Sequence, residues 1–360
     1  MNNAYPDNSP RAASRSSAIP DASGRADASC ISTGRLPSFD VVATLVNDAY
    51  ARFRSNDDGH NSEVYPALAA SPSDLFGLCI VGADGSCHVA GDWDHDFVIM
   101  SVSKPFVFAL VCQAIGPCEA RAKIGVNATG LPFNSLEAVE RAHDGRTNPM
   151  VNSGAIATTS LAPGANYDEK WRWVREGLSH FAGRDLSIDD DVHACANASN
   201  ARNQAIGRLL RSCGRIYADV DEALALYTAQ CALRVNAKDL AIMGATLADG
   251  GVNPLTGKRV VDADICRFAL AVMATAGLYE TSGDWLYQVG LPGKSGIGGG
   301  IVTVAPGKCG FGAFSPRLDA SGNSVRGQLA AQYLSDRLGL SLFASKAEEH
   351  GPFIATRREG

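Results

Sequence analysis

The amino-acid sequence predicts an α+β fold, with an antiparallel sheet flanked by helices and a helical subdomain inserted in the middle of the chain. Two β-hairpin patterns, at residues 75–93 and 300–315, stand near opposite ends of the 360-residue sequence. Between them, residues from about 116 to 275 carry apolar positions spaced by three and four, which is typical of amphipathic helices. Strands at both ends and helices between them indicate a sheet-containing domain with a helical insertion.

The first elements follow from local patterns. Residues 38–53 have apolar positions at helical spacing after a Ser/Asp start, which predicts a helix. Residues 75–93 contain two short apolar runs joined at 83–86, a hairpin signal. The apolar run that begins at Phe97 leads into a helix reaching about residue 115. Pro105 fits best in the first turn of that helix.

The later elements follow in the same way. Residues 203–214, 220–235 and 237–251 have helical periodicity, and the first and third end in glycine. The strand-like runs in 300–315 are joined at Pro306-Gly307-Lys308, which predicts a second hairpin. Residues 325–340 are amphipathic and predict a closing helix.

Composition separates the two ends of the chain from the rest. Residues 1–35 are rich in Ser, Ala, Asn, Pro and Arg, and too poor in large apolar side chains to offset their ordering entropy. We therefore expect a disordered N-terminal tail at 1–35, a catalytic domain at 36–345 and a flexible C-terminal tail at 346–360. The N-terminal segment has no apolar core of the kind that a secretory signal needs.

Charge and cysteine content narrow the functional classes. Charged residues make up 19% and the net charge is −6, which gives no reason to expect a nucleic-acid partner. No apolar run reaches eighteen residues, so we expect no membrane span. The ten cysteines form no CxxC pair and the seven histidines no HxxxH or HExxH pair. These features predict no metal site and a cytoplasmic protein with reduced thiols.

The stretch Ser101-Val102-Ser103-Lys104 places polar groups inside an apolar run. In a helix, positions i and i+3 share a face, so the Ser101 hydroxyl and the Lys104 amine can meet. An amine becomes a base for serine when burial lowers its pKa toward neutrality. The alternative is a helix cap followed by a surface lysine, and these four residues alone favour that simpler interpretation.

A second motif changes this balance. The stretch Gly290–Gly300, GLPGKSGIGGG, is similar to the Lys-Ser/Thr-Gly strand of the penicillin-recognising serine hydrolases. In those enzymes the strand lines the cleft beside the nucleophile. The alternative is a glycine-rich turn, but the two motifs together favour a serine hydrolase.

Longer motifs identify the family that the chain resembles. SVSKPF, NPMVNSGAIATTSL, ARNQAIGRLL, TLADGGVNPLTGKRVV and GLYETSGDWLYQVGLPGKSGIGGGIVTVAPGK closely resemble the serine-dependent glutaminases, over residues 38–340. The resemblance implies a β-lactamase/transpeptidase-like fold. It also implies hydrolysis of L-glutamine to L-glutamate and ammonia through an acyl-enzyme without a cofactor, in a homodimer or homotetramer.

The same resemblance implies roles for individual residues. Ser101 corresponds to the nucleophile and Lys104 to its base. Tyr279 corresponds to a site tyrosine that can pass a proton to the leaving ammonia. Ile297 corresponds to a position whose backbone N–H helps to form the oxyanion hole.

Three further positions correspond to the family's substrate-binding residues. Asn152, in NPMVNSGA, and Asn203, in ARNQA, match two asparagines that hold the substrate. Tyr227, in LYTAQC, matches a tyrosine whose hydroxyl points into the site. Without the surrounding motifs, core or turn roles would be the simpler interpretation of all three.

The chain departs from the family pattern at the substrate end of the site. Val64 stands where the family has tyrosine, with Tyr65 one position later, and Met100 replaces a glutamine before the nucleophile. Ala196 replaces the glutamate that meets the α-ammonium of glutamine. These changes leave three hypotheses, in this order: a glutaminase with weakened or altered activity, a serine amidohydrolase for another amide, and a non-catalytic binding protein on the same scaffold.

Overall fold

The computed structural model describes residues 34–345. The two predicted tails therefore lie outside the described residues, except for residues 34 and 35. The strands that form the main sheet lie in the first and last parts of this range: β1 (Gly77–Gly82), β2 (Cys87–Gly91), β5 (Gly293–Ser295), β6 (Gly300–Ala305) and β7 (Cys309–Phe314).

The five strands form an antiparallel sheet in the order β2-β1-β7-β6-β5. Both predicted hairpins are confirmed, since β1 pairs with β2 and β6 pairs with β7. The two hairpins join at the centre of the sheet, where Gly77 of β1 lies opposite Phe314 of β7. The N-terminal and C-terminal parts of the chain therefore complete one sheet together.

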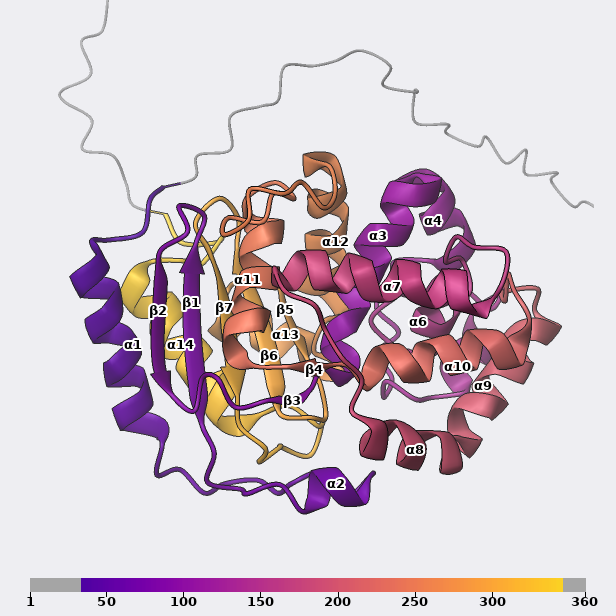
Figure 1. Ribbon diagram of the computed structural model, residues 1–360, viewed down its shortest axis with the longest axis horizontal. Coiled ribbons are helices and arrows are strands. Elements are labelled where there is room, and N and C mark those ends of the chain that lie inside the picture. The colour runs from indigo at the N-terminus through magenta and orange to yellow at the C-terminus, as the bar shows by residue number, and fades with distance from the viewer. Residues whose placement is uncertain (1–33, 346–360) are drawn as a thin grey trace, which may run out of the picture. The chain divides into compact units, whose positions relative to one another are not determined.

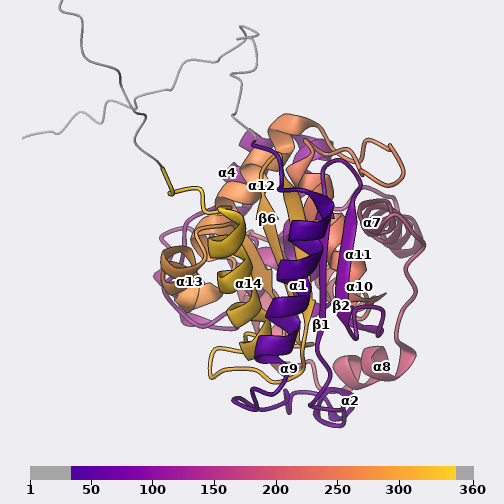
Figure 2. The ribbon, with the colours of Figure 1, turned by 90° about the vertical axis from the view of Figure 1, so that its left-hand side faces the viewer.

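Helices α1 (Phe39–Phe53) and α14 (Val325–Leu338) cover one face of this sheet. They lie side by side in front of the strands in Figure 2. Alternate residues of β1 point to opposite faces, as strand geometry requires. Leu78 and Ile80 join the core under these two helices, whereas Cys79 and Val81 join the larger core on the other face.

Helix α11 (Ala237–Ala248) packs against β1, β6 and β7 on the other face of the sheet. Two glycines of β7 permit a very close approach. A methyl group at Gly310 would lie 2.2 Å from the carbonyl oxygen of Ala241, and one at Gly312 would lie 2.0 Å from that of Ala237. Side chains at these two positions would therefore push the helix away from the sheet.

The other helices of the middle segment lie mostly to the right of the sheet in Figure 1. Their bounds are α3 (Lys104–Ile115), α4 (Pro117–Ile124), α5 (Glu137–Arg141), α6 (Asn152–Thr159), α7 (Tyr167–Ala182), α8 (Asp190–Ala198), α9 (Ala201–Ser212), α10 (Val220–Cys231) and α12 (Ala263–Ala276). Helix α6 packs against α3, α9 and α10, and it brings its N-terminus to the start of α3. That these helices form an insertion within a catalytic domain at 36–345 stays a prediction.

Short elements complete the described chain: α2 (Pro66–Ala69), α13 (Ser282–Gln288), the 3₁₀ turns η1 (Met100–Ser103) and η2 (Tyr279–Thr281), and the strands β3 (Phe97–Val98) and β4 (Arg234–Val235).

The helix predicted at 220–235 is wrong at its end. Helix α10 stops at Cys231, and the last two residues pair with β3 instead. Leu233 and Val235 are fully buried, so tertiary pairing determines their conformation.

No helix within residues 34–345 is both long and apolar enough to cross a membrane.

Candidate active site

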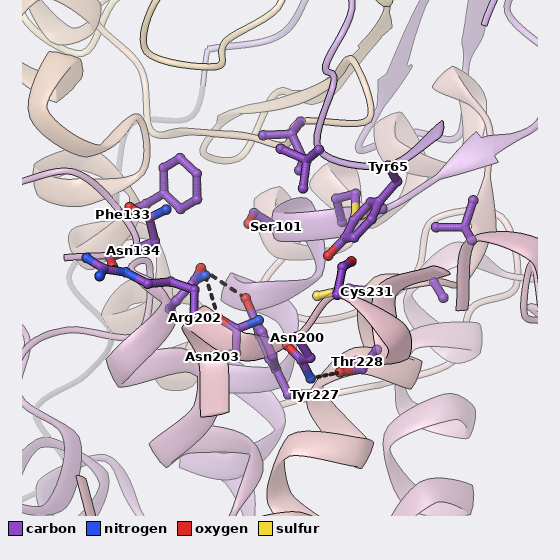
Figure 3. Close-up of a pocket in the computed structure, with 18 residues that line it drawn as sticks. Tyr65, Ser101, Phe133, Asn134, Asn200, Arg202, Asn203, Tyr227, Thr228 and Cys231 are labelled. Carbon is purple, nitrogen blue, oxygen red and sulfur yellow. Dashed lines mark hydrogen bonds between the residues drawn. The ribbon is translucent and has the colours of Figure 1, made fainter. Parts of the chain in front are cut away.

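Ser101 lies in the 3₁₀ turn η1, directly before helix α3, at the wall of a cavity of about 140 Å³. The preceding residue, Met100, has a left-handed φ of 46°, which is unfavourable for a side chain of this size. Such strain is typical of functional sites, where the surrounding structure holds a residue in one conformation. Figure 3 shows the Ser101 hydroxyl pointing into the open space between Phe133, Tyr65 and Asn203.

The turn after β5 packs directly against the backbone of the serine. A methyl group at Gly296 would lie 3.2 Å from the amide nitrogen of Ser101, so only a glycine allows this approach without a shift. Ile297 follows and lines the same cavity. Neither the N–H of Ser101 nor that of Ile297 donates to a protein acceptor within residues 34–345. Two residues that line the cavity thus have a backbone N–H without a protein acceptor in the described chain.

Lys104 is almost completely buried, with 1% of its surface exposed, at the start of α3. Its Nζ donates hydrogen bonds to Oδ1 of Asn152 (2.7 Å) and to the carbonyl oxygen of Met150 (3.3 Å). Both acceptors are uncharged, so no carboxylate compensates the ammonium here. Burial therefore lowers the pKa of Lys104 from 10.5 to about 7.

Asn152 begins helix α6 and connects the lysine to the substrate side of the cavity. Its Oδ1 also accepts a hydrogen bond from the hydroxyl of Tyr227 (3.1 Å), and its Nδ2 donates to Oδ1 of Asn203 (3.0 Å). Dashed lines mark the contacts to Asn203 and Tyr227 in Figure 3. Burial raises the pKa of Tyr227 well above its usual value, so its hydroxyl keeps its proton. The network joins side chains from α3, α6, α9 and α10.

Tyr279 belongs to η2 and also has a left-handed φ, 59°. Its hydroxyl donates to the carbonyl oxygen of Ser295 (3.4 Å). Burial raises its pKa, and an interaction with the nearby Ser101 hydroxyl opposes this rise. The buried Lys294 lies against the ring, with Nζ 3.9 Å from the ring centroid, and donates to the same Ser295 oxygen (2.7 Å).

The structure therefore places all seven residues singled out by the sequence in one region. Ser101, Asn152, Asn203, Tyr227 and Ile297 line the cavity directly. Lys104 and Tyr279 lie just behind this wall, and each connects to it through the contacts described above.

The positions that depart from the family pattern lie in the same cavity wall. Val64, Tyr65, Met100 and Ala196 all line it. Tyr65 packs on Met100 and neighbouring apolar residues, and Figure 3 shows its hydroxyl directed toward Cys231. Burial raises the pKa of Tyr65 to about 12, so this hydroxyl also keeps its proton.

Sequence analysis missed several residues that line the cavity: Phe133, Asn134, Asn200, Arg202, Thr228 and Cys231. For some of these residues, the sequence pattern could have indicated a position in the site. Asn200 and Arg202 flank Asn203, and Cys231 lies one helical turn after Tyr227 on α10, on the same face. Phe133 and Asn134 lie in a loop without periodicity, so nothing in the sequence indicated their position.

These groups can activate a hydroxyl and hold an amide next to it. The site offers a serine oxygen, a lysine with a pKa near neutrality, two backbone N–H donors and a set of neutral hydrogen-bonding side chains. Within residues 34–345, no three His, Cys, Asp or Glu side chains gather closely enough to hold a metal ion.

Comparisons with known proteins find glutaminases among both the sequence relatives and the solved structures. A protein-family model described as Glutaminase matches residues 59–343. The chain is 62% identical to "Glutaminase 2" of Yersinia pestis over 316 residues, which cover 88% of this chain and 93% of that protein. It is 47% identical to a "Glutaminase" of Colwellia psychrerythraea over 307 residues, which cover 85% and 99%.

Solved structures agree with these relatives. The probable glutaminase ybaS superposes with a TM-score of 0.85 at 44% identity, covering 86% of this chain and all of that one. A probable glutaminase from Bacillus subtilis, complexed with 6-diazo-5-oxo-L-norleucine, superposes with a TM-score of 0.76 at 29% identity. The latter match covers 84% of this chain and 96% of that one.

Proposed function

The chain belongs to the glutaminase family, and we propose that it hydrolyses L-glutamine through an acyl-enzyme formed on Ser101, with Lys104 as the base. The predicted β-lactamase/transpeptidase-like fold and the predicted glutaminase activity are confirmed by its relatives. The order of chemical steps and the roles of individual residues are our proposal. The single observation that carries it is the buried, carboxylate-free environment of the Lys104 amine.

The first step is proton removal from the serine. A neutral amine has two N–H donors and one lone pair. The Asn152 and Met150 oxygens can take the two donors of the Lys104 amine. The lone pair is then left to accept the Ser101 proton as the serine oxygen attacks the carbonyl carbon of the amide.

The attack places negative charge on the carbonyl oxygen. The backbone N–H groups of Ser101 and Ile297 are the donors that stabilise this charge, because they have no other acceptor in the described chain. The C–N bond then breaks as the proton that Lys104 took from Ser101 passes through the Tyr279 hydroxyl to the nitrogen, which leaves as ammonia, and Lys104 is neutral again. A water molecule attacks the ester, with Lys104 again taking a proton, and releases the acid and the free serine.

The amide substrate lies among the neutral side chains of the cavity. Asn152, Asn203 and Tyr227 already form one hydrogen-bonded set, so their donors and acceptors are held in position before the substrate arrives. We propose that these three residues bind the part of glutamine beyond the reacting amide.

The test is ammonia release by purified protein together with intact-mass measurement after rapid quenching. Wild-type protein should release ammonia from glutamine and show a covalent acyl adduct that maps to Ser101. Ser101→Ala should show neither. Ser103→Ala is the matched control, because Ser103 lies two residues away and does not line the cavity: its hydroxyl donates to the Met100 carbonyl oxygen and accepts from Gln230. Ammonia release by Ser101→Ala at the wild-type rate would contradict the mechanism.

Two further expectations remain proposals. A cytoplasmic location is supported by the nine cysteines of the described chain, all of which are free thiols. A homodimer or homotetramer is supported by three exposed apolar side chains near the end of α13, Tyr287, Leu342 and Phe343. Light scattering on the purified protein tests the second proposal, and a monomeric mass would reject it.

A further inference from the structure

Among residues 34–345, none that lines the cavity beside Ser101 carries a carboxylate. Its eighteen lining residues include no Asp and no Glu, and Arg202 is the one lining residue with a permanent charge. Seven asparagine, serine and threonine side chains provide most of the remaining polar groups: Ser101, Asn134, Asn152, Ser199, Asn200, Asn203 and Thr228. The lining also includes apolar side chains: Val64, Met100, Val192, Ala196 and Ala232.

Acidic groups line a neighbouring cavity. Glu63 and Glu280 line a more open space that adjoins the first one and shares Val64, Phe133 and Ile297 with it. Val64 and Phe133 thus stand in the wall that the two spaces have in common. A substrate group enclosed beside Ser101 therefore lies in surroundings that carry positive or neutral charge.

Such surroundings discriminate between two kinds of substrate. An ammonium group that leaves water needs a charged partner, because a hydrogen bond between charged groups contributes about ten- to hundredfold in affinity. Lys104 is an example of a buried amine without a carboxylate partner, because its burial destabilises the ammonium form. The lining residues that can donate hydrogen bonds to a carboxylate at the far end of the substrate include asparagines and Arg202.

We propose that this site prefers ω-amides of dicarboxylic acids that lack the α-ammonium group, and that Ala196 determines this preference. The proposal rests on the proposed function, because it uses the same Ser101 chemistry. The substrate keeps the amide and the distant carboxylate. It carries hydrogen, or another uncharged group, where glutamine carries its ammonium.

The test compares ammonia release from glutaramate with that from L-glutamine. The kcat/KM of wild-type protein should be about tenfold or more higher for glutaramate than for L-glutamine. Ala196→Glu introduces a carboxylate at the cavity wall and should move this ratio toward glutamine by about ten- to hundredfold. Ala196→Gln is the matched control: it has the same length without the charge, and the ratio should stay within about threefold of wild type. If Ala196→Gln moves the ratio as far as Ala196→Glu, the charge argument is wrong.

Glu63→Gln tests the adjoining cavity. It should leave the ratio unchanged, since Glu63 does not line the site. A wild-type preference for glutamine that disappears in Glu63→Gln would overturn the proposal, because the ammonium would then have its partner in the second cavity. A wild-type preference for glutamine that survives in that variant would overturn it as well.

A binding measurement separates this proposal from the catalytic one. Calorimetry with Ser101→Ala should find that glutarate binds about tenfold or more tightly than L-glutamate. If glutarate binds more tightly but wild-type protein hydrolyses neither amide, the proposed function fails and the preference stands. If glutamate binds more tightly while both amides are hydrolysed, the function stands and the preference is wrong.

Discussion

Nζ of Lys104 lies 2.7 Å from Oδ1 of Asn152, although the two residues are 48 positions apart in the sequence. The same oxygen accepts the hydroxyl proton of Tyr227. One amide group therefore orients the proposed base and the tyrosine proposed to bind the substrate at the same time. A charge placed on Asn152 therefore acts directly on the lysine.

Asn152→Asp should raise the pKa of Lys104. A carboxylate at hydrogen-bond distance favours the ammonium form, so more of the lysine is charged at neutral pH. The acidic limb of kcat/KM should move above pH 7, and activity at pH 7 should fall. Asn152→Ala is the control, because it removes the same hydrogen bonds without adding charge and should leave the acidic limb near its wild-type position. Coincident pH profiles for the two variants would contradict the assignment.

The wild-type pH profile follows from the two perturbed groups. Lys104 must be neutral to accept a proton, and its pKa is about 7, so kcat/KM should rise as pH increases through about 7. Tyr279 must keep its proton, and burial raises its pKa above the usual value of 10, so no decline from this group is expected below pH 10. Measurements of kcat/KM from pH 5 to 10 test this expectation. A flat profile across pH 6–8 would exclude Lys104 as the base.

Lys104→Met should inactivate the enzyme while stabilising the fold. Loss of the base should lower kcat by about 10²–10⁴. In the folded protein the lysine binds its proton less readily than in the unfolded chain, so the unfolded state holds more protons between about pH 7 and 10.5. Below pH 7 the wild-type lysine therefore lowers the free energy of unfolding by on the order of 4 kcal/mol. This loss becomes smaller as the pH rises toward 10.

Denaturant titrations of the two proteins at pH 6 and pH 9 measure that difference. The stability advantage of Lys104→Met should be larger at pH 6. An advantage that is equal at both pH values would show that the folded and unfolded lysines titrate alike.

Tyr279→Phe should separate proton transfer from packing. The ring remains against Lys294, whereas the hydroxyl beside Ser101 is lost. We expect kcat to fall by about 10²–10³ with little change in KM or in thermal stability, because the hydroxyl acts on the leaving nitrogen. Steady-state kinetics and a thermal melt provide both readouts. A variant that only raises KM would make Tyr279 a binding residue.

Gly310→Ala should strongly destabilise the protein. The new methyl group would lie 2.2 Å from the carbonyl oxygen of Ala241, so α11 must move away from the sheet. The expected loss is about 3 kcal/mol or more of unfolding free energy. Gly283→Ala in α13 is the matched control, because its methyl group would meet no atom within 4 Å. It should be neutral or stabilising by about 0.5–1 kcal/mol.

Local patterns were sufficient for much of the fold. The turns at 83–86 and 306–308 contain the glycines that a reversal requires, and the flanking runs are strand-like, so both hairpins could be predicted. Helices α9, α11 and α14 follow from apolar periodicity. Residues Arg234–Val235 could not be predicted as a strand, because their conformation depends on pairing with β3, more than 130 residues earlier.

In the candidate site, too, some features have local sequence motifs and others do not. Ser101, Lys104 and the glycine-rich strand have recognisable local motifs. The polarity of the cavity has no such motif, because it depends on side chains from several helices and loops that come together only in the folded structure. Phe133 and Asn134 illustrate this: neither has a sequence signal, yet both stand in the cavity wall.

The central pairing of β1 with β7 determines when this enzyme becomes functional during its synthesis. Ser101 leaves the ribosome early, but its partner strand at the centre of the sheet ends at Phe314 and the turn that carries Ile297 comes shortly before. A nascent chain interrupted before that point has the proposed nucleophile without the Ile297 N–H, the second donor proposed for the oxyanion, and leaves an open, unpaired strand edge that favours aggregation. Translation must therefore pass Phe314 before any molecule of glutamine is consumed.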